Sequence, residues 1–226
     1  MRKILKILFV RLPFWFILAS LLLVVTYKWL PVRYTPLMLV RSCQNIECPD
    51  GAISHRWVPL DSISVNMRKS VIASEDNLFF THNGFDIAEI QKMRQEHEKK
   101  GKKIRGCSTI SQQTAKNCFT FGTHTWARKA IEVYYTVLIE KIWGKQRILE
   151  VYLNVAETGK GMYGVEAASQ YYFHKPSLRM TLSEAAALTC CLPNPLRRTP
   201  EWASGHMAGR KAQIMDLTGK IEFRTE

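Results

Sequence analysis

Two adjacent carboxylates, Glu75 and Asp76, lie in the stretch of this sequence best suited to chemistry, S-E-D-N-L-F-F-T-H-N-G-F-D at residues 74–86. A carboxylate can take the proton of an attacking hydroxyl group, most efficiently when its pKa is raised towards neutrality. Adjacent acids at a helix end are otherwise typical of a solvated surface. Glu75 is therefore a hypothesis for a catalytic base that depends on the rest of the chain.

A second polar segment, G-C-S-T-I-S-Q-Q-T-A-K-N at residues 106–117, predicts a helix start with Ser108 or Thr109 as its N-cap. Gln112 follows Thr109 at the spacing of a capping box. Helical spacing places Thr109, Gln112 and Lys116 on one face, where hydroxyl, amide and ammonium groups could bind phosphate or sugar. A polar surface face without a ligand is the alternative.

A third set of charges lies on a helix predicted over residues 126–143, which Gly144 would end. Arg128 and Glu132 are four residues apart and share a face of this helix. On an exposed helix such a pair contributes only about 0.2–0.5 kcal/mol and has no function of its own. Four apolar residues are predicted to form the buried stripe of this helix: Ile131, Tyr135, Leu138 and Ile142.

The carboxylates must be positioned by the segment that precedes them, whose apolar spacing predicts a helix. Asp61 or Ser62 is its predicted N-cap, and its predicted end lies near Ala73. Glu75 would then lie at or just beyond the C-terminal end of this helix. The helix dipole disfavours a negative charge there, and burial would act in the same direction. Both effects are expected to raise the pKa of Glu75.

The remainder of the chain predicts a mostly helical fold without a series of strands. Residues 91–105 have almost no apolar face and are predicted to form a solvated loop that could close over a polyanionic headgroup. Glycines at 159, 161 and 164 predict another loop. Helices are predicted at residues 146–154, 165–173, 181–192 and 210–217, the first with a core of Ile148, Leu149, Val151, Tyr152 and Leu153.

The N-terminus predicts a membrane anchor. Basic residues within positions 1–11 precede an apolar segment at 12–30, and about 19 such residues can span a bilayer core of ~30 Å. A cleavable signal peptide is the alternative, but no A-x-A-like pattern follows the apolar segment, which favours an uncleaved anchor. The basic flank is expected to stay in the cytoplasm, so the domain after residue 31 is expected outside.

Composition agrees with one domain behind that anchor, because 226 residues with 46% hydrophobic content can bury a core. The net charge of +13 favours an anionic partner, and the predicted topology and missing motifs argue against nucleic acid. Cys43 and Cys48 could form a small bridge, whereas Cys190 and Cys191 are predicted to be buried thiols. No zinc-site spacing occurs.

Five motifs between residues 60 and 200 resemble, in type and in order, the five motifs of the peptidoglycan glycosyltransferases, glycosyltransferase family 51. The matching residues are Glu75-Asp76 with Phe79, His82, Gly84 and Asp86, then G-C-S-T-I-S-Q-Q-T-A-K-N, Arg128-Lys129 with Glu132, I-L-E-V-Y-L-N and E-A-A-A-L-T-C-C-L-P-N-P. The chain most resembles the monofunctional, membrane-anchored form. Consistently, no Ser-x-x-Lys or Lys-Thr-Gly occurs for a transpeptidase. Cys107 departs from the family's usual Gly or Ala there.

The resemblance implies a lysozyme-like, two-lobed helical domain that polymerises lipid II by inverting transfer. The 4-hydroxyl of an acceptor would attack the anomeric carbon of the growing chain, and undecaprenyl pyrophosphate would leave. Residues 31–59 are rich in turn formers and are predicted to be a linker. Together with the predicted anchor and the resemblance, this gives four expected regions: a cytoplasmic basic segment (1–11), a transmembrane anchor (12–30), a linker (31–59) and the glycosyltransferase domain (60–226). The protein would be a single-pass protein of the inner membrane with its catalytic domain on the periplasmic side.

The resemblance also assigns expected roles to residues. Glu75 would be the base, and Lys116 and Arg128 would hold the pyrophosphate with Lys129 as a weaker candidate. Glu132, the second catalytic residue, would orient these cations or a divalent ion. A general-acid role for Glu132 is the less favoured alternative, since a pyrophosphate leaves without full protonation. The expected lining of the cleft comprises Asp76, Phe79, His82, Ser108, Thr109 and Gln112. A divalent cation such as Mg²⁺, shared with the pyrophosphate, is the expected cofactor.

Expected partners are lipid II, the growing glycan, the membrane and cell-wall synthesis proteins, but no nucleic acid. Two alternatives to the polymerase remain at this point. A lysozyme-like lytic enzyme would also use a glutamate, but it would not need the pair of cations at Lys116 and Arg128. The other alternative is an inactive, membrane-anchored scaffold that binds wall precursors.

Overall fold

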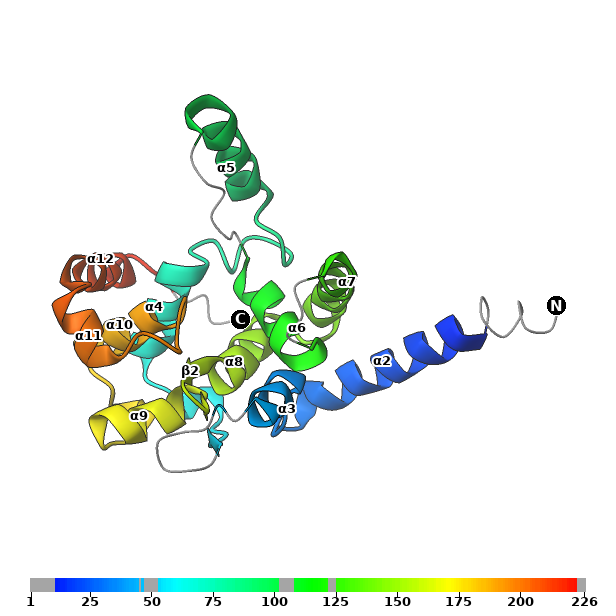
Figure 1. The fold of residues 1–226 in the computed structure, drawn as a ribbon, viewed down its shortest axis with the longest axis horizontal. Helices are drawn as coiled ribbons and strands as arrows, with labels where there is room; N and C mark the ends of the chain where they lie inside the picture. Colours follow the sequence, from blue (N-terminus) through cyan, green and yellow to red (C-terminus); the bar gives the residue numbers. More distant parts are fainter. Residues whose placement is uncertain (1–10, 45, 47–52, 102–107, 122–124, 223–226) are drawn as a thin grey trace.

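A computed structural model describes residues 11–44, 46, 53–101, 108–121 and 125–222, and these are mostly helical (Figure 1). The helices, including two 3-10 helices labelled η, are α2 (Leu12–Trp29), α3 (Pro36–Cys43), η2 (Leu60–Ser62), α4 (Val65–Glu75), α5 (Ile87–Lys100), α6 (Ile110–Phe119), α7 (Trp126–Ile142), α8 (Lys145–Val155), α9 (Val165–Phe173), η3 (Ser177–Arg179), α10 (Leu182–Cys191), α11 (Pro200–Gly205) and α12 (Ala208–Gly219). The strands are β1 (Ser54–His55), β2 (Glu157–Gly159) and β3 (Met162–Tyr163). The prediction of a mostly helical protein is confirmed.

Helix α4 begins and ends later than its sequence predicted. Ser64 caps it by accepting a hydrogen bond from the backbone nitrogen of Met67 at 3.1 Å. The predicted caps, Asp61 and Ser62, lie in η2 instead, so that prediction is wrong. The helix runs to Glu75 rather than ending near Ala73, and Glu75 is therefore its last residue.

Helix α6 lies at the centre of the domain and packs against both α7 and α8. Its capping box is confirmed: the Thr109 hydroxyl accepts from the Gln112 nitrogen, and the Gln112 side chain accepts from the Thr109 nitrogen. Helix α8 is the second central element, and all five of its predicted core residues are buried. These two buried helices therefore form a rigid support beneath the site.

Helix α7 buries a face that partly matches the predicted one, and Leu138 and Ile142 are partly buried against the core. Tyr135 is buried as predicted, but Ile131 is 38% exposed, so its prediction as a core residue is wrong. The buried side instead includes Glu132, Thr136 and Ile139. A sequence pattern based on apolar residues cannot show this face, because Glu132 and Thr136 are polar.

A small sheet was not expected from the sequence. Its strand order is β1-β3-β2, with β1 parallel and β2 antiparallel to β3. Strand β1 and helix α3 both come from residues 31–59, the stretch with the composition of a linker. Arg41 of α3 forms a two-pronged ion pair with Glu157 of β2, at 2.9 Å and 3.1 Å, which fastens this stretch to the domain.

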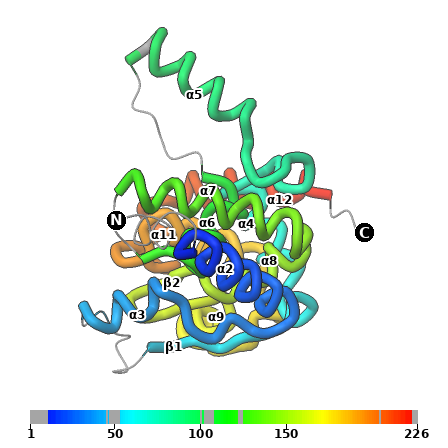
Figure 2. Tube along the Cα trace, turned by 90° about the vertical axis from the view of Figure 1, so that its right-hand side faces the viewer, coloured from blue at the N-terminus to red at the C-terminus, as the bar shows by residue number. Residues whose placement is uncertain are grey.

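Helix α5 replaces most of the solvated loop predicted for residues 91–105. It projects away from the other helices in both views (Figure 1 and Figure 2). Asp86 caps its start through the nitrogen of Glu89 at 2.8 Å, and Gly101 ends it with a φ of 60°. The loop prediction is therefore wrong up to Lys100. Residues 102–107, including Cys107, lie outside the described residues.

Helix α2 is apolar and long enough to cross a membrane, as the sequence predicted. Its C-terminal half contacts α7 and the residue that follows it: the Ser20 and Tyr134 hydroxyls lie 2.6 Å apart, and the Trp143 indole nitrogen donates to the Val24 carbonyl at 2.7 Å. This apolar helix is thus in direct contact with the helical domain that follows it.

The cysteine predictions have different outcomes. Cys190 and Cys191 are buried in α10 as free thiols, which confirms their predicted placement. Cys43 carries a free, exposed thiol, and its proposed partner Cys48 lies outside the described residues. Helix α10 packs against α4, α11 and α12, so its two thiols belong to the hydrophobic core on that side of the domain.

Gly164 offers a test of the fold. Its φ is +81°, and a Cβ added there would lie 2.5 Å from the backbone oxygen of Asn154. The backbone of Asn154 could shift only at a large energetic cost. Gly164→Ala is therefore expected to lower the free energy of unfolding by at least about 1 kcal/mol. The expected drop in the thermal midpoint is roughly 2–4 °C per kcal/mol for a domain of this size.

Gly209→Ala is the matched control, since a Cβ at this position in α12 would meet no atom within 4 Å. Alanine here, in the first turn of α12, is expected to leave the thermal midpoint unchanged or to raise it slightly, because it restricts the unfolded chain more than glycine does. Equal thermal midpoints for the two variants would contradict the close contact at Gly164.

Candidate active site

Glu75 is half-buried at the end of α4, and its carboxylate accepts a hydrogen bond from the Gln113 side chain at 3.0 Å. Burial is the main cause that raises its pKa above the usual value for a glutamate. The hydrogen bonds of Gln113 and Ser74 and the charges of Arg210 and Lys116 oppose this increase. The predicted direction is therefore confirmed, and a carboxylate with a raised pKa is suited to accept a proton.

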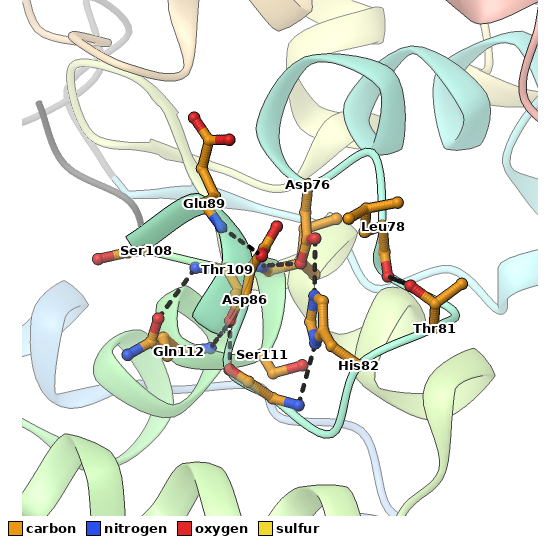
Figure 3. A network of polar contacts seen from close by, with 12 residues as sticks. Asp76, Leu78, Thr81, His82, Asp86, Glu89, Ser108, Thr109, Ser111 and Gln112 are labelled. Carbon is orange, nitrogen blue, oxygen red and sulfur yellow. Dashed lines mark hydrogen bonds and ion pairs between the residues drawn. The ribbon is translucent and has the colours of Figure 1, made fainter. Parts of the chain in front are cut away.

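Asp76, the residue after Glu75, makes structural contacts with His82 and with the start of α6 (Figure 3). It is 7% exposed, and one of its oxygens accepts from the Ile110 nitrogen at 3.0 Å. The other oxygen lies 2.8 Å from His82 Nε2. Because the Gly84 nitrogen donates to His82 Nδ1 at 3.1 Å, the ring proton lies on Nε2 and points to Asp76. Asp76 thus joins the end of α4 to the first turn of α6.

The cap of α6 is also occupied by structural hydrogen bonds. The Thr109 hydroxyl donates to the Gly84 carbonyl at 2.7 Å, while Gln112 closes the capping box. Both side chains are buried, whereas Ser108 is half-exposed and its carbonyl accepts from Gln113 at 3.4 Å. Thr109 and Gln112 therefore shape the site from within, and Lys116 alone of the three predicted to share a face is exposed.

Phe79 lies inside the core and not at a surface. It is fully buried, and the Lys145 ammonium lies 4.6 Å from the centre of its ring. The same ammonium forms an ion pair with Glu140 at 2.7 Å. Phe79 consequently supports the turn between α4 and α5 by packing, and presents no exposed surface to a ligand.

A group of charges on α7 forms the second half of the site. Glu132 is only 2% exposed, and Arg128 donates to one of its oxygens at 2.8 Å. Lys129 forms an ion pair with the other oxygen. The weak surface pair inferred from spacing is thus a buried carboxylate held by two cations, which we call the Glu132 cluster (Arg128, Lys129 and Glu132).

Lys116 connects the Glu132 cluster to Glu75. Desolvation is the main cause that lowers the pKa of the Lys116 ammonium, although part of its side chain is exposed. Within the cluster, Glu132 raises this pKa and the two cations lower it. Lys116 also lowers the pKa of Glu75, so its charge acts on both halves of the site. Gln113 and Lys116 lie one turn apart on α6, which fixes the two halves relative to each other.

Three residues of the site carried no recognised signal in the sequence. Gln113 holds Glu75, and the Tyr152 hydroxyl donates to the Gln113 side chain at 3.3 Å. Arg210 reaches from α12 and donates to the Ser74 hydroxyl at 3.1 Å. Tyr152 was expected only as a core residue, and Arg210 is far from Glu75 in the chain, so spacing could not reveal either contact.

A dedicated metal centre does not fit the residues around the site. In the part of the chain that the structure describes, no group of three His, Cys, Asp or Glu side chains could hold a metal ion. Both oxygens of Glu132 are already bound by cations, and those of Asp76 by His82 and Ile110. Any divalent ion in this reaction would therefore need ligands from elsewhere.

Glu75, a carboxylate with a raised pKa, is held by Gln113, which lies one turn of α6 before Lys116. Such an arrangement could activate a hydroxyl group and stabilise a leaving anion, which is the chemistry of a group-transfer enzyme. The family model described as Transglycosylase matches residues 43–218. The chain belongs to this transglycosylase family, which confirms the resemblance found in its motifs.

Individual relatives agree with this family. A biosynthetic peptidoglycan transglycosylase of Bacteroides thetaiotaomicron is 44% identical over 212 residues, covering 93% of this chain and 85% of the relative. The protein of the same name from Caulobacter vibrioides is 40% identical over 220 residues, covering 97% and 93%. That of Escherichia coli O17:K52:H18 is 52% identical over 159 residues, covering 70% and 66%.

The contact of Arg210 predicts a measurable change at Glu75. Arg210 favours the charged carboxylate, so Arg210→Ala is expected to raise the pKa of Glu75 further and move its titration to higher pH. Carbon-13 NMR of glutamate-labelled protein, with the Glu75 signal assigned through Glu75→Gln, would measure this shift.

Arg179→Ala is the matched control, because Arg179 is an exposed arginine in η3. This control is expected to leave the pKa of Glu75 the same as in the unsubstituted protein. An Arg210→Ala protein with an unchanged or lowered pKa at Glu75 would contradict the electrostatic link.

Proposed function

We propose that this chain polymerises lipid II into β-1,4-linked peptidoglycan glycan strands by inverting glycosyl transfer, with release of undecaprenyl pyrophosphate. The observation that carries this proposal is the arrangement on α6, where Gln113 holds Glu75 and Lys116, one turn later, faces the Glu132 cluster. Membership in the transglycosylase family and the names of the relatives support the same activity. No transpeptidase activity accompanies it.

Glu75 is the base in this proposal. The 4-hydroxyl of the acceptor sugar is a poor nucleophile until its proton is removed, and general-base catalysis typically contributes about 10²–10⁴-fold. The hydroxyl oxygen bonds to the anomeric carbon of the growing chain, and its proton passes to the Glu75 carboxylate. Gln113 fixes the orientation of that carboxylate through its hydrogen bond at 3.0 Å.

The cations act on the leaving group. As the bond to the anomeric carbon breaks, its electron pair stays with the pyrophosphate oxygen, and fixed positive charge stabilises that anion. Lys116 and Arg128 are the residues assigned to this role, with Lys129 as a weaker contributor. Glu132 orients both neighbouring cations through its ion pairs. A pyrophosphate departs as an anion, so no general acid is needed.

A divalent cation such as Mg²⁺ belongs to this proposal only as an ion carried by the pyrophosphate itself. Phosphate oxygens are the ligands that Mg²⁺ prefers alongside water. The carboxylates near the site are already engaged by cations or hydrogen bonds.

Helix α2 is assigned as the membrane anchor that brings the site to lipid-linked substrates. The basic N-terminal flank supports a cytoplasmic N-terminus, and hence a catalytic domain on the periplasmic side of the inner membrane. Proteins of cell-wall synthesis are expected partners on that side. A protease added outside sealed, right-side-out vesicles is expected to digest the domain, and protection of the domain from that protease would contradict this orientation.

Labelled lipid II separates the proposal from its two alternatives. Elongating glycan in an assay of purified protein supports the polymerase. Breakdown of preformed glycan would favour a lytic enzyme, and binding without turnover would favour a scaffold. A phosphoglycolipid inhibitor that mimics the donor is expected to stop elongation.

The base assignment predicts that Glu75→Gln loses polymerisation by at least about 100-fold while lipid II still binds. Glutamine keeps the shape of the side chain but cannot accept the proton. Elongation and lipid II binding are measured separately on the same preparation.

Glu222→Gln serves as the control, because Glu222 is an exposed carboxylate near the C-terminus and its loss is expected to leave both measurements unchanged. If Glu75→Gln polymerised at a near-normal rate, Glu75 would not be the base.

The leaving-group assignment predicts that Arg128→Ala slows elongation by about 100-fold, the typical cost of one fixed donor at a developing anion. Lys129 continues to pair with Glu132 in this variant, so the thermal midpoint is expected to change by only a few degrees. Arg94→Ala, which removes an exposed arginine from α5, is the control. A variant that loses its thermal transition together with its activity would contradict a role confined to the chemistry.

A further inference from the structure

Arg147 of α8 binds the end of the anchor helix. The last carbonyl groups of a helix lack partners within the helix, and positive charge is favoured beside them. Arg147 donates to the Tyr27 carbonyl from two nitrogens, at 3.1 Å and 2.7 Å. It also donates to the Leu30 carbonyl at 2.6 Å. A single guanidinium thus binds two carbonyls at the C-terminal end of α2.

The Arg147 side chain is itself held from two sides, and it is 13% exposed. Glu150, three residues later on α8, accepts from it at 2.6 Å. The Trp57 ring lies 5.1 Å from the guanidinium carbon. A planar guanidinium held in this way needs little further ordering to bind its carbonyls, and a lysine could not reproduce the fork. The contact of Arg147 with the Tyr27 and Leu30 carbonyls is therefore rigid.

Helix α8 connects this contact to the catalytic base. Its Tyr152 donates to Gln113, the residue that holds Glu75. The helix is buried along most of its length, so both contacts belong to one rigid element. Trp143 and Tyr134 make further contacts to α2, but both precede α8 in the chain, and neither binds the end of the anchor.

From these contacts we infer that Arg147 is a positioning residue that fixes the angle between the anchor and the catalytic domain. It thereby sets the height of Glu75 above the bilayer. This inference rests on the proposed function, because height matters only for substrates that are tied to a membrane. A lipid-linked sugar in a bilayer reaches a fixed distance from the surface, and an error of about 1 Å in placement can cost as much as 100-fold in rate.

In detergent the same constraint disappears. A micelle carries the lipid chain of the substrate along with the protein and imposes no common plane on the two. Arg147 should then matter little to the rate, whereas a residue needed for folding or for chemistry would matter in both settings. The two environments therefore separate a positioning role from a structural one.

The experiment compares the elongation of labelled lipid II by Arg147→Ala in proteoliposomes and in detergent. The rate in proteoliposomes is expected to fall about tenfold or more, and the rate in detergent less than about twofold. Arg147→Lys keeps the charge without the fork and is expected to show the same selective loss at a smaller size. The exposed-arginine variant Arg179→Ala is expected to leave both rates unchanged.

The outcomes distinguish this inference from the proposed function. A lack of elongation by the unchanged protein in detergent would overturn the proposed function, and with it the inference. If Arg147→Ala or Arg147→Lys lowered the elongation rate by the same factor in proteoliposomes and in detergent, only the positioning role would be overturned. A full rate for both variants in proteoliposomes would overturn it as well. Arg147→Lys decides the matter if Arg147→Ala does not fold.

Discussion

The hydrogen bond from the Ile110 nitrogen to the Asp76 carboxylate, at 3.0 Å, is the contact on which the arrangement of the site depends. The first turn of a helix has nitrogens without partners and favours a negative charge, and Asp76 supplies both the acceptor and the charge. It thereby fixes the end of α4 against the start of α6. Glu75 precedes Asp76 and Gln113 follows Ile110 by one turn, so this contact brings the base to the residue that holds it.

The electrostatics of the site follow from how its charges are distributed among the three helices α4, α6 and α7. A single carboxylate with a raised pKa lies at the end of α4, while the Glu132 cluster concentrates positive charge on α7. Lys116 on α6 lies within the electrostatic reach of both. Separating the base from the cations in this way keeps the carboxylate able to accept a proton, because direct ion pairing would have lowered its pKa.

Sequence reasoning succeeded where a local pattern determines a contact. The capping box of α6 and the core of α8 depend on residues close together in the chain. It failed where partners come from distant segments. The buried state of Glu132, the contact of Arg210 with Ser74 and the sheet formed with β1 all depend on packing that local spacing does not contain. Residues 91–100 form a helix despite their weak apolar face, because Asp86 and Gly101 define its two ends.

The adjacent thiols of α10 have a consequence for the compartment in which this domain is proposed to work. Burial raises the pKa of Cys191 to about 12, and that of Cys190 is raised as well. The thiolate is the form that reacts with oxidants and disulfides, and burial makes it scarce and inaccessible. Outside the cytoplasm, where disulfide formation is favoured, these cysteines would stay reduced through packing alone. Once folded, the domain could thus keep these two thiols reduced in oxidising surroundings without a dedicated reductant.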